Sequence, residues 1–450
     1  MKKAVETELN QFMRGVRERN PYEKEFQQAV YEFAETVMPW YLDHDKYRSQ
    51  KVLERLTEPD RIISFRVTWE ADNGDVMMNR GWRVQFNNNL GPYKGGLRFH
   101  ASVNRSVLKF LGFEQVFKNA LTGLPMGGAK GGANFNPRGR SEAEVMRFCH
   151  AMMTELQYYI GEDVDVPAGD IGVGPREIGF LFGKYNQLQN RWSGALTGKP
   201  SDLGGSLIRK EATGYGCIYF CEHALNHQGK TLLGKSVAIS GSGNVAIYAA
   251  EQALEQGARV VTLSDSNGTV YFPQGIDRDQ LPLIKSRKEE NRERLSKIVG
   301  SLRGAEYHSR RKPWGFPADI VIPCATQNEL NQREAKALVR NGTMAVCEGA
   351  NMPATYDARA FLQASNVLFL PGKAANAGGV AVSGLEQSQN SMRVSWSREE
   401  VNDKLHGIMR DIHSKCVEHG TVNEEVDYVV GANVAGLSTI AQSISAFGIL

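Results

Sequence analysis

The feature that most constrains the fold is a glycine turn between a predicted strand and a predicted helix. Apolar residues at 237–239 predict a short buried strand, and Gly241-Ser242-Gly243-Asn244-Val245-Ala246 follows almost directly. A helical pattern comes next, and then a second apolar strand at 260–263. This is the context that a G-x-G-x-x-A dinucleotide fingerprint requires. Because the glycines let a pyrophosphate approach the helix N-terminus, the sequence predicts a Rossmann-type dinucleotide domain.

The rest of the chain predicts an α/β protein of two domains. Short apolar strands at 320–322, 344–346 and 367–370 alternate with segments that suit crossover helices, which favours a doubly wound parallel sheet. A stretch rich in Gly, Pro, Ser and Thr, residues 194–206, is the best candidate boundary. We therefore expect a dinucleotide domain over 206–425 and an α/β substrate and oligomerisation domain over 1–205. A C-terminal helix, 426–450, is expected to pack back on the substrate domain.

Within the first 205 residues the pattern indicates helices and a mixed sheet. Residues 1–60 are typical of amphipathic helices, and alternating residues between 62 and 86 predict strands. The turn Asp72-Asn73-Gly74-Asp75 joins two of these strands as a hairpin. Helices are predicted over 103–121 and over 141–160, the second beginning at the cap-forming Ser141.

Three lysines in this region suggest a site for an anionic substrate. Lys130 lies among the glycines of residues 127–132, which let backbone and substrate approach its amine closely. Lys94 lies in another glycine-rich segment, and Lys118 follows Gln115 by three positions on a predicted helix. Asp170 adds a carboxylate. We expect Lys130 to act as a neutral base, because an amine held away from water and near other cations, here Lys94 and Lys118, loses basicity.

The second strand of the dinucleotide domain leaves the choice of cofactor open. Asp265 at its end suits a ribose hydroxyl and NAD, whereas the preceding Ser264 suits the 2′-phosphate of NADP. Positive charge for that phosphate is available in the run that follows, which is otherwise explained as a solvated helix. The interpretation leans towards NADP. The basic candidates are Lys285, Arg287, Lys288 and Arg292.

Other kinds of site are disfavoured. Residues 229–236 match the P-loop pattern, but a helix precedes them and a strand follows, the reverse of what phosphate binding needs. His223 and His227 lack the accompanying ligands of a metal site, so no metal is expected. The net charge of +3, with scattered basic residues, does not indicate nucleic-acid binding.

The composition favours a cytoplasmic protein. Six cysteines show no framework spacing in a chain of 450 residues, and free thiols in a reducing compartment are the simplest interpretation. No signal peptide is expected, and there is no apolar run of about 18 residues to predict a membrane span.

Taken together, these segments resemble the hexameric glutamate dehydrogenases, in particular the NADP-dependent type of bacteria and lower eukaryotes. The likeness extends over essentially the whole chain. It is carried by residues 91–100, 124–137, 166–172, 211–216, 323–328, 348–351 and 373–384, together with the nucleotide turn.

The resemblance implies the reversible oxidative deamination of L-glutamate to 2-oxoglutarate and ammonium by a homohexamer. Lys130 and Asp170 match the catalytic residues. Lys94 and Ser383 match groups on the side-chain carboxylate, Gln115 and Lys118 match groups on the α-carboxylate, and Gly169 lines the pocket. The predicted cofactor contacts are Thr213, Gly241, Ser242, Gly243, Asn244, Val245, Ser264, Asp265, Lys285, Ala325, Thr326, Asn351 and Asn376.

Several alternatives remain open at this stage. An NAD-dependent glutamate dehydrogenase, or a related leucine- or phenylalanine-type amino acid dehydrogenase, belongs to the same class. Lys94 disfavours the leucine- or phenylalanine-type enzyme, because a charged amine would be costly to bury in a pocket for an apolar side chain. A P-loop phosphotransferase and a non-catalytic NADP-binding regulator are alternatives from other classes.

Overall fold

The computed structural model describes residues 2–289 and 293–449, and the chain divides into two compact units. Unit 1 comprises residues 1–207, 382–401 and 433–450, and unit 2 comprises 208–381 and 402–432. The sequence predicts residues 382–401 to belong to the dinucleotide domain and 426–432 to the substrate domain, whereas the former lie in unit 1 and the latter in unit 2. The two-domain α/β class is confirmed.

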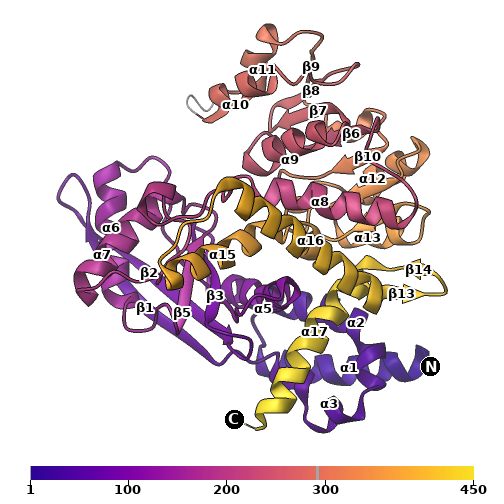
Figure 1. Cartoon of the computed structure of the whole chain (residues 1–450). Coiled ribbons are helices and arrows are strands. Elements are labelled where there is room, and N and C mark those ends of the chain that lie inside the picture. Colours follow the sequence, from indigo (N-terminus) through magenta and orange to yellow (C-terminus); the bar gives the residue numbers. More distant parts are fainter. Residues whose placement is uncertain (1, 290–292, 450) are drawn as a thin grey trace. The chain divides into compact units, whose positions relative to one another are not determined.

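Unit 1 is built on a mixed sheet of five strands in the order β1-β2-β4-β3-β5. Strands β1, β2, β3 and β5 are labelled in Figure 1. The β1–β2 and β2–β4 pairs are antiparallel, and β3 lies parallel to both β4 and β5. The strands are β1 (Arg61–Glu70), β2 (Val76–Asn87), β3 (Tyr93–Phe99), β4 (Gly128–Ala133) and β5 (Asp165–Gly169). The helices are α1 (Lys2–Arg19), α2 (Lys24–Leu42), α3 (Asp45–Ser49), α4 (Val52–Arg55), α5 (Arg105–Thr122), α6 (Glu142–Leu156), α7 (Pro175–Gln189), the 3₁₀ turn η1 (Ser201–Leu203), and most of α15 (Gly378–Met392) and α17 (Tyr428–Phe447).

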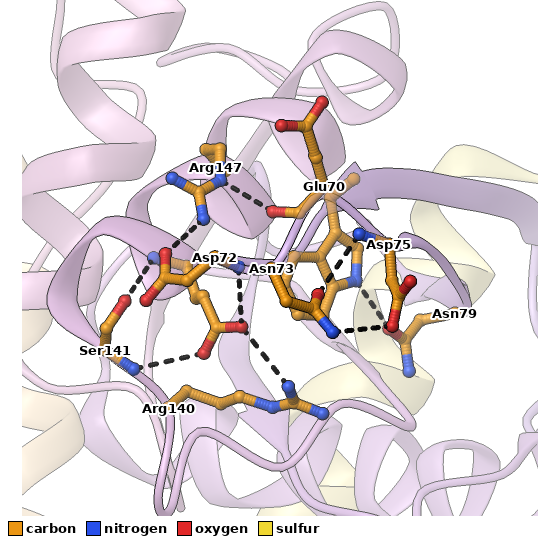
Figure 2. Close-up of polar contacts among 10 residues, drawn as sticks. Glu70, Asp72, Asn73, Asp75, Asn79, Arg140, Ser141 and Arg147 are labelled. Carbon is orange, nitrogen blue, oxygen red and sulfur yellow. Dashed lines mark hydrogen bonds and ion pairs between the residues drawn. The ribbon is translucent and has the colours of Figure 1, made fainter.

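The predicted hairpin between β1 and β2 and the predicted start of α6 at Ser141 are confirmed. Hydrogen bonds connect the turn of the hairpin to α6 (Figure 2). Ser141 caps α6, accepting from the backbone N–H of Glu144 at 3.1 Å. Arg147 on α6 donates to Asp72 Oδ1 at 2.6 Å and to the Glu70 carbonyl at 2.6 Å. Ser141 and Arg147 hold the pKa of the Asp72 carboxyl below its usual range by hydrogen bonding. The turn is thereby fixed to the first turns of α6.

The glycine-rich segments around Lys94 and Lys130 are inner strands, which the sequence analysis did not predict. Every residue of β4 is buried, as are six of the seven residues of β3. A Cβ on Gly95 would collide with the carbonyl of Ala129, and one on Gly128 would collide with Val116 of α5. Glycine is therefore required because β3, β4 and α5 approach one another at backbone distance.

Unit 2 contains a sheet of seven strands in the order β12-β11-β10-β6-β7-β8-β9. Strands β12 to β7 are parallel, whereas β8 and β9 form an antiparallel edge that the sequence analysis missed. The strands are β6 (Ser236–Ile239), β7 (Arg259–Asp265), β8 (Gly268–Tyr271), β9 (Glu306–Ser309), β10 (Ile320–Ile322), β11 (Ala345–Cys347) and β12 (Leu368–Leu370).

The helices of unit 2 connect these strands. They are α8 (Ala212–His227), α9 (Asn244–Glu255), α10 (Leu281–Glu289), α11 (Leu295–Ile298), α12 (Gln332–Arg340), α13 (Tyr356–Gln363), α14 (Gly372–Ala375) and most of α16 (Arg398–Gly420), with 3₁₀ turns η2 (Val299–Ser301) and η3 (Pro313–Gly315). A small hairpin, β13 (Thr421–Val422) and β14 (Glu425–Val426), follows α16 and precedes α17 along the chain.

One helix of the described residues, α17, is long and apolar enough to cross a membrane by length and composition. However, 61% of its apolar window is buried inside the protein. That burial is typical of a core helix.

A fully buried ion pair fixes the sheet of unit 1. Arg83 on β2 donates from Nε to Asp165 Oδ2 at 2.9 Å and makes a second bond to Oδ1, and neither side chain is exposed. Arg83 Nη1 also donates to the Gly95 carbonyl at 3.0 Å, and Gln85 Nε2 donates to Asp165 Oδ2 at 2.9 Å. The pair thus links β2, β3 and β5.

We expect Asp165→Asn to lower the free energy of unfolding by about 3–5 kcal/mol, because it leaves the buried Arg83 charge without its counter-charge. Urea unfolding followed by circular dichroism measures the loss. The control is Arg147→Ala, which breaks a partly exposed pair with Asp72 and should cost far less. Equal losses in the two variants would contradict this account.

Candidate functional site

The buried Lys130 and the partly buried Asp170 and Arg98 form a charged group on, or directly after, three neighbouring strands of unit 1. Leu97 of β3 pairs with Gly131 of β4 and with Gly169 of β5, so the three charged residues lie beside the same rung of the sheet. Lys130 Nζ lies 3.1 Å from Asp170 Oδ2, and Arg98 Nε donates to the same oxygen at 2.8 Å. The structure thus brings together the two predicted catalytic residues and adds Arg98.

The pKa of Lys130 lies below that of an ordinary lysine. Burial, which penalises the charged amine, is the main cause; Asp170 opposes it, while Arg98 and Arg83 add to it. The expected exclusion of the amine from water is thus confirmed as the main cause, whereas the cations that contribute are Arg98 and Arg83 and not the predicted Lys94 and Lys118. Burial also opposes ionisation of Asp170, but Lys130 and Arg98 outweigh it, so the pKa of Asp170 lies below its usual range.

Lys94 and Ser383 are joined through a residue that the sequence analysis missed. Lys94 Nζ donates to Thr197 Oγ1 at 2.8 Å, and Thr197 Oγ1 is 2.7 Å from Ser383 Oγ. All three are buried. Thr197 lies within residues 194–206, which had been interpreted as a domain boundary because of their Gly, Ser and Thr content. No local signal distinguished the buried part of that segment from a linker.

Helix α5 carries Gln115 and Lys118, both half-buried, on the side of unit 1 that covers β3 and β4. Gln115 Nε2 donates to Asn119 Oδ1 at 2.7 Å, and Asn119 Nδ2 donates to the Lys94 carbonyl at 3.0 Å. Lys118 lies three residues beyond Gln115 on the same helix, as predicted. Gly169 ends β5 next to Asp170.

In unit 2 the predicted strand, turn and helix are confirmed as β6, residues 240–243 and α9. Gly241 has a left-handed φ of +86°, and its N–H donates to Ser264 Oγ at 2.9 Å, which closes the turn. Gly243 precedes α9, and a Cβ built on it would meet nothing within 4 Å. The turn therefore offers open space at a helix N-terminus, which fits the diphosphate of a dinucleotide.

A partly buried carboxylate holds the loop that contains Ala325 and Thr326. Glu329 Oε1 accepts from the N–H of Ala325 at 2.9 Å, from that of Thr326 at 3.4 Å and from Ser240 Oγ at 2.8 Å. Burial raises the pKa of Glu329. This residue was missed because two of its partners are backbone groups and the third, Ser240, lies far along the chain. The loop lies against the glycine turn, since a Cβ on Gly241 would be 3.3 Å from Ala325 Cα.

The other predicted cofactor residues of unit 2 also have defined neighbours. Asn376 Nδ2 donates to Asn351 Oδ1 at 2.9 Å and to the Ala350 carbonyl at 3.0 Å. Thr213 lies on α8, where a Cβ on Gly379 would collide with its hydroxyl.

The acidic residue after β7 is held by backbone groups. Asp265 Oδ1 accepts from the N–H of Asn267 at 2.9 Å, and Oδ2 accepts from that of Leu295 at 2.9 Å. Next to it, Arg294 Nη1 donates to Ser266 Oγ at 2.7 Å. Burial lowers the pKa of Lys288, which Asp265 opposes and Arg294 reinforces.

The remaining predicted basic residues have other partners. Lys285 Nζ lies 3.1 Å from Glu251 Oε1 and 4.2 Å from the centre of the Tyr248 ring. Arg287 pairs with Glu293 at 2.8 Å. Arg292 lies outside the described residues.

The two disfavoured motifs are accounted for. Helix α8 ends at His227 and β6 begins at Ser236, so the P-loop-like segment joins a helix to a strand, as predicted. Among residues 2–289 and 293–449, no group of three or more His, Cys, Asp or Glu residues is arranged to hold a metal ion.

Comparison with known proteins identifies the class. Residues 204–448 match the glutamate/leucine/phenylalanine/valine dehydrogenase family model, and residues 59–187 match the dimerisation domain of the same dehydrogenases. The chain belongs to this family.

Within the family, the chain is similar to glutamate dehydrogenases over nearly its whole length. It is 52% identical to the NADP-specific glutamate dehydrogenase of Escherichia coli K12, over 98% of this chain and 99% of that one. It is 54% identical to the NAD(P)-specific glutamate dehydrogenase of Xylanibacter ruminicola, over 95% and 97%. The structure of Plasmodium falciparum glutamate dehydrogenase matches with a TM-score of 0.97 at 47% identity, covering 100% of this chain and 96% of that one. The resemblance inferred from the sequence is thus confirmed.

Proposed function

We propose that this chain catalyses the reversible oxidative deamination of L-glutamate to 2-oxoglutarate and ammonium, with NADP as the hydride acceptor. The observation that carries the proposal is that two neighbouring strands of unit 1 each carry a buried amine: Lys130 of β4, which is paired with Asp170, and Lys94 of β3, which is bound to the Thr197 hydroxyl. The similarity to glutamate dehydrogenases over nearly the whole chain supports it.

Substrate binding in this proposal uses two anchors for two carboxylates. Lys94 and Ser383, with Thr197 between them, hold the side-chain carboxylate, and Gln115 and Lys118 hold the α-carboxylate. Charge-assisted hydrogen bonds at both ends fix the α-carbon in one orientation. Gly169 lines the pocket without adding bulk.

NADP, when bound, accepts the hydride from the α-carbon of glutamate. The neutral Nζ of Lys130 then takes a proton from the water that attacks the resulting iminium carbon. A carboxylate oxygen of Asp170 carries protons to and from the departing nitrogen. Burial of Lys130 supports this role because it favours the neutral amine.

For the cofactor, we propose that Gly241, Ser242, Gly243, Asn244 and Val245 hold the diphosphate at the start of α9. Thr213, Ala325, Thr326, Asn351 and Asn376 complete the proposed cofactor contacts, the last two near the nicotinamide.

A preference for NADP over NAD is proposed from the residues at and just beyond the end of β7. Both Asp265 oxygens accept from backbone N–H groups, which ties this carboxylate to the loop that follows β7 and to the start of α11. Ser264, Ser266, Lys288 and Arg294 then supply hydroxyl and positive groups for a 2′-phosphate. Lys285, which is paired with Glu251, remains a predicted contact.

We further propose a homohexamer located in the cytoplasm. A solved glutamate dehydrogenase from Thermus thermophilus, 27% identical with a TM-score of 0.80 over 91% of this chain and 97% of that one, is described as hetero-hexameric. All six cysteines of this chain are free and buried, which is compatible with a reducing compartment.

We expect Lys94→Leu to lower kcat/KM for glutamate by about 100-fold or more, because it removes a buried charge that pairs with the substrate carboxylate. Some activity on apolar amino acids should appear, since an apolar residue suits their side chains. Initial rates with glutamate, leucine and norvaline measure both effects.

The control for this variant is Lys235→Ala, at the P-loop-like segment, which should leave glutamate kinetics unchanged. ATP hydrolysis by the wild-type protein that Lys235→Ala abolishes would favour a phosphotransferase instead. Unchanged glutamate kinetics in Lys94→Leu would remove Lys94 from the pocket.

For the cofactor, Arg294→Gln should raise the KM for NADPH by about 10-fold or more while leaving the KM for NADH unchanged, because a charge-assisted bond to the 2′-phosphate is lost. Arg303→Gln, which removes an exposed arginine paired with Asp277 and Asp279, is the matched control. An equal effect on both cofactors would place Arg294 away from the 2′-phosphate.

A further inference from the structure

A second buried ion pair lies directly beside the Lys94–Thr197–Ser383 group. Lys199 Nζ is 3.0 Å from Glu386 Oε1, and the two side chains are 1% and 0% exposed. Glu386 follows Ser383 by three residues on α15, so one turn of helix carries both the hydroxyl and the carboxylate. The proposed chemistry uses neither member of the pair.

The carboxylate of Glu386 accepts hydrogen bonds from the backbone of the two residues that follow Thr197. Its Oε2 accepts from the N–H of Gly198 at 2.9 Å, and its Oε1 accepts from that of Lys199 at 3.3 Å. With the Lys199 ammonium, this carboxylate therefore has three donors. Backbone N–H groups on consecutive residues leave the peptide after Thr197 little freedom to rotate.

The ammonium of Lys199 binds the backbone of Leu196, the residue that precedes Thr197. It donates to the Leu196 carbonyl and to Asn390 Oδ1, the latter at 2.7 Å. Asn390 Nδ2 in turn donates to the Gly204 carbonyl at 2.7 Å. The N–H of Thr197 itself donates to the Pro167 carbonyl of β5 at 3.0 Å. The position of Thr197 is thus fixed by hydrogen bonds to the residue before it, to the residue after it and from its own N–H.

A buried ion pair is weak evidence for stability, because removing two charges from water costs as much as their attraction returns. Its better-supported use is to specify one arrangement of the groups around it. Here the specified arrangement is that of Thr197 Oγ1, which contacts both Lys94 Nζ and Ser383 Oγ. Burial lowers the pKa of Lys199, and the carboxylate of Glu386 opposes that shift.

We propose that Lys199 and Glu386 are positioning residues that set Thr197, and through it Lys94 and Ser383, for the side-chain carboxylate of a five-carbon diacid. This inference rests on the proposed function. Selectivity for the diacid then depends on a pair that does not touch the substrate. The pair should affect substrate affinity and leave the chemical step and cofactor binding unaltered.

The test compares three variants with the wild type, whose glutamate and 2-oxoglutarate activity with NADPH is measured first. Glu386→Gln replaces one carboxylate oxygen with an NH₂ group that faces donors. Asn390→Ala removes a neutral partner of Lys199 and is the milder variant should Glu386→Gln fail to fold. Glu23→Gln is the matched control, because Glu23 forms a buried pair with Lys109 at 3.2 Å, away from the 194–206 segment.

We expect Glu386→Gln to raise the KM for 2-oxoglutarate by about 10-fold, with kcat within about threefold of wild type, since the lost interaction acts on binding. The KM for NADPH should not change. Asn390→Ala should show the same pattern with a smaller rise. Glu23→Gln should lower the melting temperature and leave every KM unchanged.

Two results would overturn the inference. One is an unchanged KM for 2-oxoglutarate in folded Glu386→Gln or, where that variant does not fold, in Asn390→Ala. The other is a parallel rise in Glu23→Gln, which would reduce the effect to general destabilisation. An inactive wild-type protein would instead refute the proposed function, and with it the substrate named here.

Discussion

The account depends on one interaction, the contact of a buried amine with a carboxylate that a guanidinium also holds. Lys130 Nζ and Arg98 Nε both lie within 3.1 Å of Asp170 Oδ2. Burial disfavours the charge on Lys130 and lowers its pKa, while Lys130 and Arg98 lower the pKa of Asp170. The lowered pKa of the amine favours its action as a base beside a carboxylate with which it can exchange protons.

This contact is possible because the strands around it are rich in glycine. Glycines in β3 and β4 let neighbouring backbones and α5 approach closely, and the same two strands carry the charged Lys94, Arg98 and Lys130. Arg83 and Asp165 link β2, β3 and β5, and Lys199 and Glu386 fix the segment that carries Thr197. Two buried ion pairs thus surround the proposed substrate groups without belonging to them.

The sequence predicted what is encoded locally and missed what depends on distant pairing. The turn at Gly241, the hairpin at Asp72 and the cap at Ser141 are each contained within a few residues, and all three are confirmed. The strands β3 and β4 were missed because glycine has low strand propensity, and only neighbours far along the chain reveal why it is needed. Arg98, Thr197 and Glu329 were missed for the same reason, since their partners lie in other segments or in the backbone.

The pH dependence of kcat/KM for glutamate oxidation, measured in the wild type, Arg98→Gln and Arg98→Lys, tests the central claim most directly. Loss of the Arg98 charge raises the pKa of Lys130, because that charge disfavours a protonated amine nearby. The account predicts that the rising limb of the profile moves to higher pH in Arg98→Gln and stays close to its wild-type position in Arg98→Lys. A limb at the same pH in folded, active Arg98→Gln would contradict it.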